Sequence, residues 1–478
     1  KNGGNLLNNK ALDFIKNFSY TLSSNLLSLV ISTLVVLIIP KLIGVEEYGY
    51  WQLYIFYTSY IGFLHFGWND GIYLRYGGKE YDSLDKKMFF SQYYMLFTVQ
   101  LLIGVLISIY ALLFVQGENR VFIVQMTSIA LVIVNSRYML LFLLQATNRI
   151  RIYAKITMLD RILYVGLIIL LLAFGIRNFK LMIIADLLGK GVSLLVAMYA
   201  CKDIVFRNIS QFTFTLKEAY LNLSVGIKLM LSNIAGKFIV GFVKLGIERS
   251  WDIATFGKVS LTLSISNLVM LFINAVGVIM YPILRRTNES KLPNIYMTMR
   301  DVLMIILLGV LIIYYPLKSI LSGWLPEYAE SLNYMAILFP IVIYEGKMSL
   351  LINTYLKTLR KEKTILFINV ITVSMSALFT LVTTVLLRNL DFAIISIVIL
   401  LALRSVISEM ILSKNLNITV LKDIVFELGM TSIFIFTAWK LDSFITVLIY
   451  GLFYGIYLFV KRTDIKNSAQ NLKILMKA

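Results

Sequence analysis

The sequence predicts an all-α polytopic membrane protein. Of its 478 residues, 59% are hydrophobic and only 15% are charged, and the mean hydropathy is +0.81. A soluble protein contains about 25% charged residues, so this chain has too few charges to cover the surfaces of soluble domains. Apolar stretches of about 20 residues, the length of a helix that crosses a bilayer, recur along the whole chain.

About fourteen transmembrane helices are predicted from these stretches. In order, they cover residues 16–39, 47–67, 88–115, 121–146, 153–174, 179–201, 227–247, 254–281, 301–321, 329–355, 364–387, 391–412, 421–438 and 442–460. The second is the least regular, because it contains His65 and several glycines, and the thirteenth is short. Pro316, Pro326 and Pro340 lie in or near the ninth and tenth stretches, where proline is expected to kink or break a helix.

The connections between these stretches alternate in positive charge. One connection, for example, contains Arg285, Arg286, Lys291 and Arg300, whereas the preceding turn contains only Arg249. Because cytoplasmic loops collect lysine and arginine, this alternation predicts that both termini are cytoplasmic. The same rule accounts for the net charge of +19 without a nucleic-acid partner. All connections are short and leave no room for a soluble catalytic domain.

Cysteine and histidine are almost absent from the sequence. Cys201 is the only cysteine and His65 the only histidine, so neither a disulfide framework nor a metal site is expected. A membrane-embedded histidine is usually a hydrogen-bonded packing residue, and a proton relay at His65 is the less favoured alternative.

An internal repeat relates the first and seventh stretches. Residues 22–26 (LSSNL) resemble residues 230–234 (MLSNI), and residues 45–49 (VEEYG) resemble residues 253–257 (IATFG), both at an offset of 208. The two copies lie six stretches apart, an even number, so both have the same orientation, as in transporters built from two parallel lobes. The predicted organisation is two pseudo-symmetric six-helix lobes, 1–217 and 218–420, plus two C-terminal helices and a cytoplasmic tail in 421–478. Such transporters bind substrate between the lobes.

The entry to the second stretch carries a family resemblance. Pro40 is followed by Lys41 and by a Gly-x-x-x-Tyr-Gly turn made by Gly44, Tyr48 and Gly49. This segment, together with the sequence FGWNDG at 66–71, resembles Wzx-type polysaccharide flippases of the multidrug/oligosaccharidyl-lipid/polysaccharide exporter superfamily. The motifs cover mainly the first hundred residues, and the span count, polarity and repeat extend the resemblance to the whole chain.

The resemblance implies an alternating-access flippase. Its substrate would be an undecaprenyl-pyrophosphate-linked oligosaccharide repeat unit, moved to the outer leaflet of the bacterial cytoplasmic membrane for surface polysaccharide synthesis. Membrane lipids, a polysaccharide polymerase and a chain-length regulator are the implied partners. No cofactor is expected, although transport can be coupled to a sodium or proton gradient.

Charged residues within the predicted spans are candidates for function, because a charge in hydrocarbon is costly. The spans place six cations and three anions at membrane depth: Arg137, Arg161, Lys190, Lys237, Lys244, Lys347, Asp160, Asp186 and Glu345. Asp186 and Lys190, four residues apart, are expected to pair on one helix face. Asp160 and Arg161 are expected to help bridge the fourth, fifth and sixth spans with Arg137. Glu345 and Lys347 do not face each other, so at least one of them requires a partner elsewhere.

Lys237 is the strongest candidate for a substrate-binding cation. It lies near the middle of the seventh stretch, on the same face as Asn233 and Lys244. Lys244 is close enough to the outer interface to snorkel, whereas Lys237 is not. Lys237, with Arg137, Lys347 and Arg161, is therefore predicted to line a cationic cavity, and Asn25 is the counterpart of Asn233 in the repeat.

Three alternatives remain open at this stage. A lipid II flippase would share the cationic cavity and the fourteen spans. A cation-coupled multidrug exporter of the same superfamily is disfavoured by the positive excess among embedded charges. An enzyme, such as a membrane polymerase or glycosyltransferase, is disfavoured because the turns on the outer side are short.

Overall fold

The computed structural model describes residues 30–286, 289–441 and 445–477. These residues form helices joined by short turns, and no strand occurs among them. The chain divides into two compact units, Lys1–Ile234 and Ala235–Ala478. The boundary falls inside helix α9 (Leu216–Ser250). The assignment of two equivalent six-helix lobes remains a prediction.

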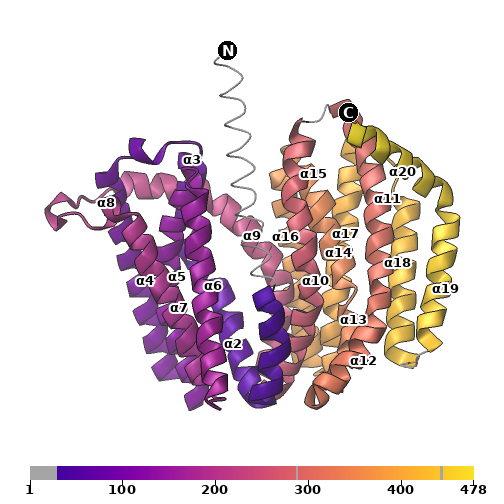
Figure 1. Ribbon diagram of the computed structural model, residues 1–478, viewed down its shortest axis with the longest axis horizontal. Coiled ribbons are helices and arrows are strands. Elements are labelled where there is room, and N and C mark those ends of the chain that lie inside the picture. Colours follow the sequence, from indigo (N-terminus) through magenta and orange to yellow (C-terminus); the bar gives the residue numbers. More distant parts are fainter. Residues whose placement is uncertain (1–29, 287–288, 442–444, 478) are drawn as a thin grey trace. The chain divides into compact units, whose positions relative to one another are not determined.

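The first unit is a bundle of long helices (Figure 1). After the apolar helix Val30–Ile43, its elements are α2 (Val45–Ile61), η1 (Gly62–His65), α3 (Trp68–Tyr76), η2 (Tyr81–Ser83), α4 (Lys86–Phe114), α5 (Glu118–Ala146), α6 (Ile150–Ala173), α7 (Phe179–Ala200), α8 (Lys202–Val205), η3 (Ile209–Gln211) and the start of α9. Helix α5 is central: it packs against α2, α3, α4, α6 and α7. Accordingly, 72% of its most apolar segment is buried, against 22% in α4 and α6.

The second predicted stretch, 47–67, corresponds to α2 followed directly by η1 and ends at a break in the helix. Its helix breaks at Phe66 and Gly67, which both adopt positive φ, before α3 begins. His65 stabilises the break, because its Nδ1 accepts a hydrogen bond from the backbone N–H of Gly67 at 3.0 Å. Gly67 and Gly71 then allow α3 to pack directly on the backbone of α9. The four-residue spacing of these two glycines predicts close helix packing, and this contact confirms it.

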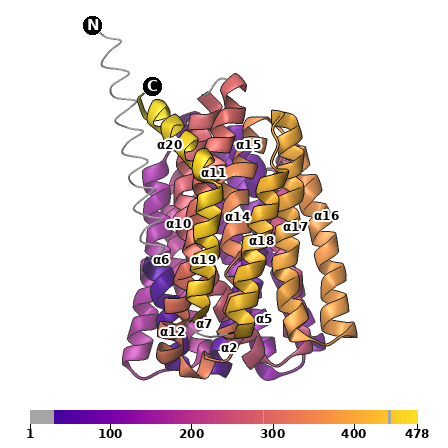
Figure 2. The same cartoon turned by 90° about the vertical axis from the view of Figure 1, so that its right-hand side faces the viewer.

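The second unit contains the rest of α9 and the helices that follow it (Figure 2). These are α10 (Ile253–Arg286), η4 (Glu289–Lys291), α11 (Leu292–Val310), η5 (Leu311–Ile313), α12 (Tyr314–Trp324), η6 (Pro326–Tyr328), α13 (Asn333–Leu338), α14 (Ile341–Lys347), η7 (Met348–Ile352), α15 (Asn353–Thr358), α16 (Glu362–Thr380), η8 (Leu381–Leu386), α17 (Leu390–Leu416), α18 (Leu421–Phe436), η9 (Thr437–Leu441), α19 (Ile445–Val460) and α20 (Arg462–Lys477). A bend of 64° separates α19 from the start of α20, which packs along α11.

Proline positions explain the interruptions in the ninth and tenth predicted stretches. Pro316 follows the 3-10 turn η5, Pro326 opens η6, and Pro340 separates α13 from α14. Proline lacks the backbone N–H that would continue the helical hydrogen-bond ladder. Irregular turns therefore lie at or next to all three prolines, while the spans Leu292–Trp324 and Asn333–Thr358 run on through Pro316 and Pro340.

The membrane assignment is confirmed by the lengths and composition of the helices. Among the described residues, ten helices are long and apolar enough to cross a bilayer, or eleven if α19 and the start of α20 form one bent span. The other predicted stretches correspond to the shorter helix Val30–Ile43, to α2 and to α10. Most of the first predicted stretch, 16–39, lies outside the described residues.

Candidate functional site

Arg137 occupies a closed polar site inside the first unit. Its Nη1 donates to Asp160 Oδ2 at 2.7 Å and to Ser193 Oγ at 3.1 Å, which links α5, α6 and α7. Gly189 permits this approach, since a Cβ there would lie 3.2 Å from the Asp160 carbonyl oxygen. The expected bridge between the fourth, fifth and sixth spans is present. Arg161, by contrast, is exposed at the surface of α6.

Asp186 forms a second closed site in the same unit. The Tyr54 hydroxyl of α2 donates to Asp186 Oδ2 at 2.7 Å, and Lys190 pairs with the other carboxylate oxygen. The pairing predicted from the four-residue spacing is therefore confirmed. His65, also buried, lies 3.7 Å from Asp70 through Nε2 while Nδ1 serves the backbone break. Its geometry fits the packing role that the sequence favoured.

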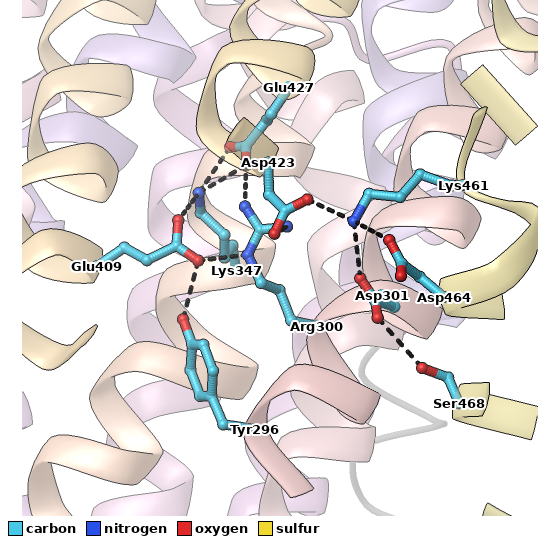
Figure 3. A network of polar contacts seen from close by, with 10 residues as sticks. All are labelled: Tyr296, Arg300, Asp301, Lys347, Glu409, Asp423, Glu427, Lys461, Asp464 and Ser468. Atoms are coloured by element: carbon cyan, nitrogen blue, oxygen red, sulfur yellow. Dashed lines mark hydrogen bonds and ion pairs between the residues drawn. The ribbon is translucent and has the colours of Figure 1, made fainter. Parts of the chain in front are cut away.

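Lys347 lies at the centre of a buried ionic network in the second unit (Figure 3). Its Nζ, which has no exposed surface, lies 2.8 Å from Glu409 Oε2 and 2.7 Å from Glu427 Oε2. Arg300 of α11 contacts the same two glutamates, at 2.5 Å and 3.4 Å. The Tyr296 hydroxyl also donates to Glu409 at 3.0 Å. Two cations and two anions thus neutralise one another.

The network continues toward the C-terminal helices. Lys461, between α19 and α20, pairs with Asp423 of α18, with Asp464 at 2.9 Å and with Asp301 of α11 at 3.4 Å. Ser468 of α20 donates to Asp301 at 3.2 Å. As Figure 3 shows, the charges form a chain from α17 to α20. It ties α18, α19 and α20 to α11.

The count of six cations and three anions at membrane depth, made from the sequence, was incomplete. Arg404 and Glu409 lie in the predicted stretch 391–412, and Asp423 and Glu427 lie in 421–438, but the tally leaves them out. The signal was available, since Asp423 and Glu427 are four residues apart on one face of α18. Lys347 is consequently not part of an uncompensated excess, because its partners come from α17 and α18.

Arg404, also left out of the tally, forms a separate polar group. Its Nη1 donates to Glu345 Oε1 at 2.7 Å and its Nε donates to Asn369 Oδ1 at 2.9 Å, so α14, α16 and α17 meet here. Gly236 of α9 faces this group: a Cβ at that position would lie 3.6 Å from Arg404 Nη2. The Glu345 side chain is 30% exposed, whereas Glu409 and Glu427 are closed off. This ion pair is therefore accessible.

Lys237 follows Gly236 in the chain and lies on the surface of the second unit. Lys237 and Asn233 are both exposed, on one face of α9, while Ile239 and Val243 on the opposite face are buried. Lys244 is partly buried, with its Nζ 5.2 Å from the centroid of the Phe256 ring. Asn25 lies outside the described residues. Lys237 is thus exposed and is the chain neighbour of a glycine that faces Arg404. Exposed lysine and arginine side chains can bind an anion through charge-assisted hydrogen bonds.

Solved structures resemble this protein over most of its length. A multidrug resistance MATE family transporter of the MOP superfamily, facing inward, has 16% identity and a TM-score of 0.59, covering 81% of this chain and 95% of its own. The lipid II flippase MurJ, in an inward closed conformation, has 14% identity and a TM-score of 0.64, covering 94% and 99%. A MOP superfamily transporter from Pyrococcus furiosus, described by the reverse polarity of its binding pocket, has 16% identity and a TM-score of 0.51, covering 84% and 96%.

These similarities establish the fold. At 14–16% identity, the likeness identifies the architecture shared by MATE transporters and MurJ. No family model matches the sequence, and no curated protein sequence matches it. The protein is thus a multi-pass α-helical membrane protein with the fold that MATE proteins and MurJ share.

Proposed function

We propose that this protein is a flippase for undecaprenyl-pyrophosphate-linked oligosaccharides in the bacterial cytoplasmic membrane. The observation that carries the proposal is the position of Lys237 beside Gly236, which faces the Arg404–Glu345 ion pair. A diphosphate bound here would accept charge-assisted hydrogen bonds from both cations, about twice as strong as neutral ones. The substrate would compete with Glu345 for Arg404, so binding is offset by a broken ion pair and release remains possible.

The length of the match supports a lipid-linked substrate. The match to the lipid II flippase MurJ covers 94% of this chain, whereas the match to the MATE multidrug transporter covers 81%. A flippase for lipid-linked sugars also handles a long isoprenoid tail, which can remain in the bilayer while the polar head moves. Lipid II carries the same kind of diphosphate, so a lipid II flippase is the nearest variant of this proposal.

A cation-coupled multidrug exporter is the second candidate. The partly exposed carboxylate of Glu345 favours it, because a drug cation or a coupling ion can bind to such a group. The two candidates differ in which residue contacts the substrate. Anion transport depends on Lys237 and Arg404, whereas cation export depends on Glu345 and tolerates the loss of Lys237.

Replacement of Lys237 by Ala tests the proposal. The expected result is a loss of surface polysaccharide of about tenfold or more, since one charge-assisted hydrogen bond contributes ~1.5–3 kcal/mol. Lys237→Arg should retain part of the export. The assay measures surface polysaccharide in source cells that lack the native gene, with protein level checked by immunoblot.

Lys228→Ala is the matched control. Lys228 is exposed on the same helix but lies at the edge of the predicted span 227–247, so its loss should leave export unchanged. Full export by Lys237→Ala at normal protein level would refute the assignment. Accumulation of lipid II in the deleted cells, with normal polysaccharide, would select the lipid II variant. Increased sensitivity to cationic drugs alone would select the exporter.

A further inference from the structure

A polar pocket with aromatic walls lies in the second unit, away from Lys237. It has a volume of about 300 Å³, and its lining includes Trp439, Tyr334, Asp391, Glu330 and Lys258. In the predicted topology these residues belong to helix ends that face the outside. This volume is at the small end of the usual range for ligand pockets, so it admits a single ring better than a long chain.

Four separate elements build the pocket. Lys258 lies in the second turn of α10, Tyr334 lies in the first turn of α13, Asp391 lies in the first turn of α17, and Trp439 lies in the π-helical segment η9. The segment before α13 is held against α10 by a hydrogen bond of 3.3 Å from the Thr262 hydroxyl to the Ser331 carbonyl. π-Helical turns are uncommon and occur frequently at functional sites.

The charges around the pocket are balanced when one lysine outside its lining is counted. Two carboxylates, Asp391 and Glu330, face one lysine in the lining, Lys258. A second lysine, Lys440, lies with its Nζ 4.2 Å from the centroid of the Trp439 ring. One face of the indole is therefore already in contact with a cation. This balance favours a neutral ligand over a diphosphate or an organic cation.

Sugar rings have the chemistry that this lining recognises. Their hydroxyl groups both donate and accept hydrogen bonds, which carboxylates, the Asn333 amide and the Lys258 ammonium can satisfy. Their apolar C–H faces pack against aromatic rings, here Trp439 and Tyr334, which are also rigid and amphipathic. The Lys237 region provides cations for a phosphate, whereas this pocket provides the groups for a neutral sugar.

We infer that this pocket binds a sugar ring at the outer end of the second unit. The claim that this ring belongs to a lipid-linked oligosaccharide rests on the proposed function. The binding itself does not, because it follows from the lining of the pocket. A sugar bound here after translocation would be held briefly on the outer side, and this binding would oppose transport back to the cytoplasmic side.

Saturation-transfer difference NMR on the purified full chain in nanodiscs tests this inference. The probes are N-acetylglucosamine, galactose and, as the organic cation, tetraphenylphosphonium. At least one sugar should receive saturation at its ring protons. Trp439→Ala should weaken that binding by about tenfold, the size of one good contact, and Trp439→Phe should retain most of it. Asp391→Asn should weaken it as well.

Trp324→Ala is the matched control. Trp324 is an exposed tryptophan in α12 of the same unit and is not among the residues that line the pocket, so its loss should leave sugar binding unchanged. Absence of sugar binding to the native chain, equal binding by Trp439→Ala, or binding of tetraphenylphosphonium alone would each overturn the inference. Normal export by Lys237→Ala with sugar binding intact would refute the proposed function and leave the pocket assignment standing.

Discussion

Embedded lysines of this protein fall into two kinds, which Lys347 and Lys237 represent. Lys347 is fully buried between Glu409 and Glu427, with contacts of 2.7–2.8 Å. Lys237 lies on the surface of α9. A buried charge that loses its partner is strongly destabilising, whereas an exposed charge contributes little to folding. The two lysines should therefore respond to substitution in opposite ways.

We expect Lys347→Met to destabilise the protein by about 3–5 kcal/mol, because two buried carboxylates lose one of the two cations that they share. Thermal unfolding of detergent-purified protein measures the effect. Glu427→Gln added to Lys347→Met should recover part of the loss, since Arg300 then faces a single carboxylate, Glu409, and the charges balance again. Lys237→Met is the matched control and should leave the melting temperature nearly unchanged. An unchanged melting temperature in Lys347→Met would contradict the network.

At the scale of the helices, the contact between α3 and α9 leaves no space for a side chain at its glycines. A Cβ on Gly71 would lie 1.9 Å from the Asn222 carbonyl oxygen, and a Cβ on Gly226 would lie 1.9 Å from the Gly67 carbonyl oxygen. Backbone atoms occupy that space and cannot rotate away. Arg75 of α3 reinforces the contact through Glu218 at 3.0 Å. Small residues therefore determine how α3 and α9 approach.

Gly71→Ala should lower stability by ~1–3 kcal/mol or more, because the two helices must separate to admit the methyl group. The control is Gly455→Ala in α19. Gly451 and Gly455 are four residues apart, a spacing that predicts close helix packing. The structure has open space within 4 Å of both Cβ positions, so that prediction is wrong. Gly455→Ala should be neutral or stabilise by up to about 1 kcal/mol, through lower chain entropy. Thermal unfolding compares the two variants, and equal losses would contradict the packing.

For the whole molecule, the alternation of charge predicts which helix ends face the cytoplasm. Lys361, in the connection between α15 and α16, and Trp324, at the end of α12, should lie on opposite sides of the membrane. Both residues are exposed, and the single native cysteine, Cys201, is buried.

In a Cys201→Ala background, a membrane-impermeant maleimide should label Trp324→Cys in intact cells. Lys361→Cys should react only after the cells are opened. These results are expected because loops rich in lysine and arginine stay on the cytoplasmic side of the membrane. Mass shift on gels measures the labelling, with the cysteine-free protein as the blank. Reaction of both positions from the same side would contradict the predicted topology.

The local sequence was sufficient to predict the helices and many of the irregular turns within them. Hydropathy summed over about 20 residues identifies a span, and proline removes a donor wherever it occurs, as at Pro340. Pairings within one turn or between adjacent spans also followed, as with Asp186 and Lys190 or with Arg137 and Asp160. Each of these depends on residues that are near in the chain or on adjacent helices.

Tertiary structure decided which charged side chains are neutralised by a buried partner and which are accessible. Lys347 meets Glu409 and Glu427 across separations of 62 and 80 residues, and Arg404 meets Glu345 across 59. Such partners depend on how helices rotate and pack, which hydropathy does not encode. The sequence by itself thus determined a multi-pass helical protein rich in embedded charge. Only packing separated a closed network around Lys347 from the accessible cation at Lys237, because burial and partner distance set the free energy of each charge.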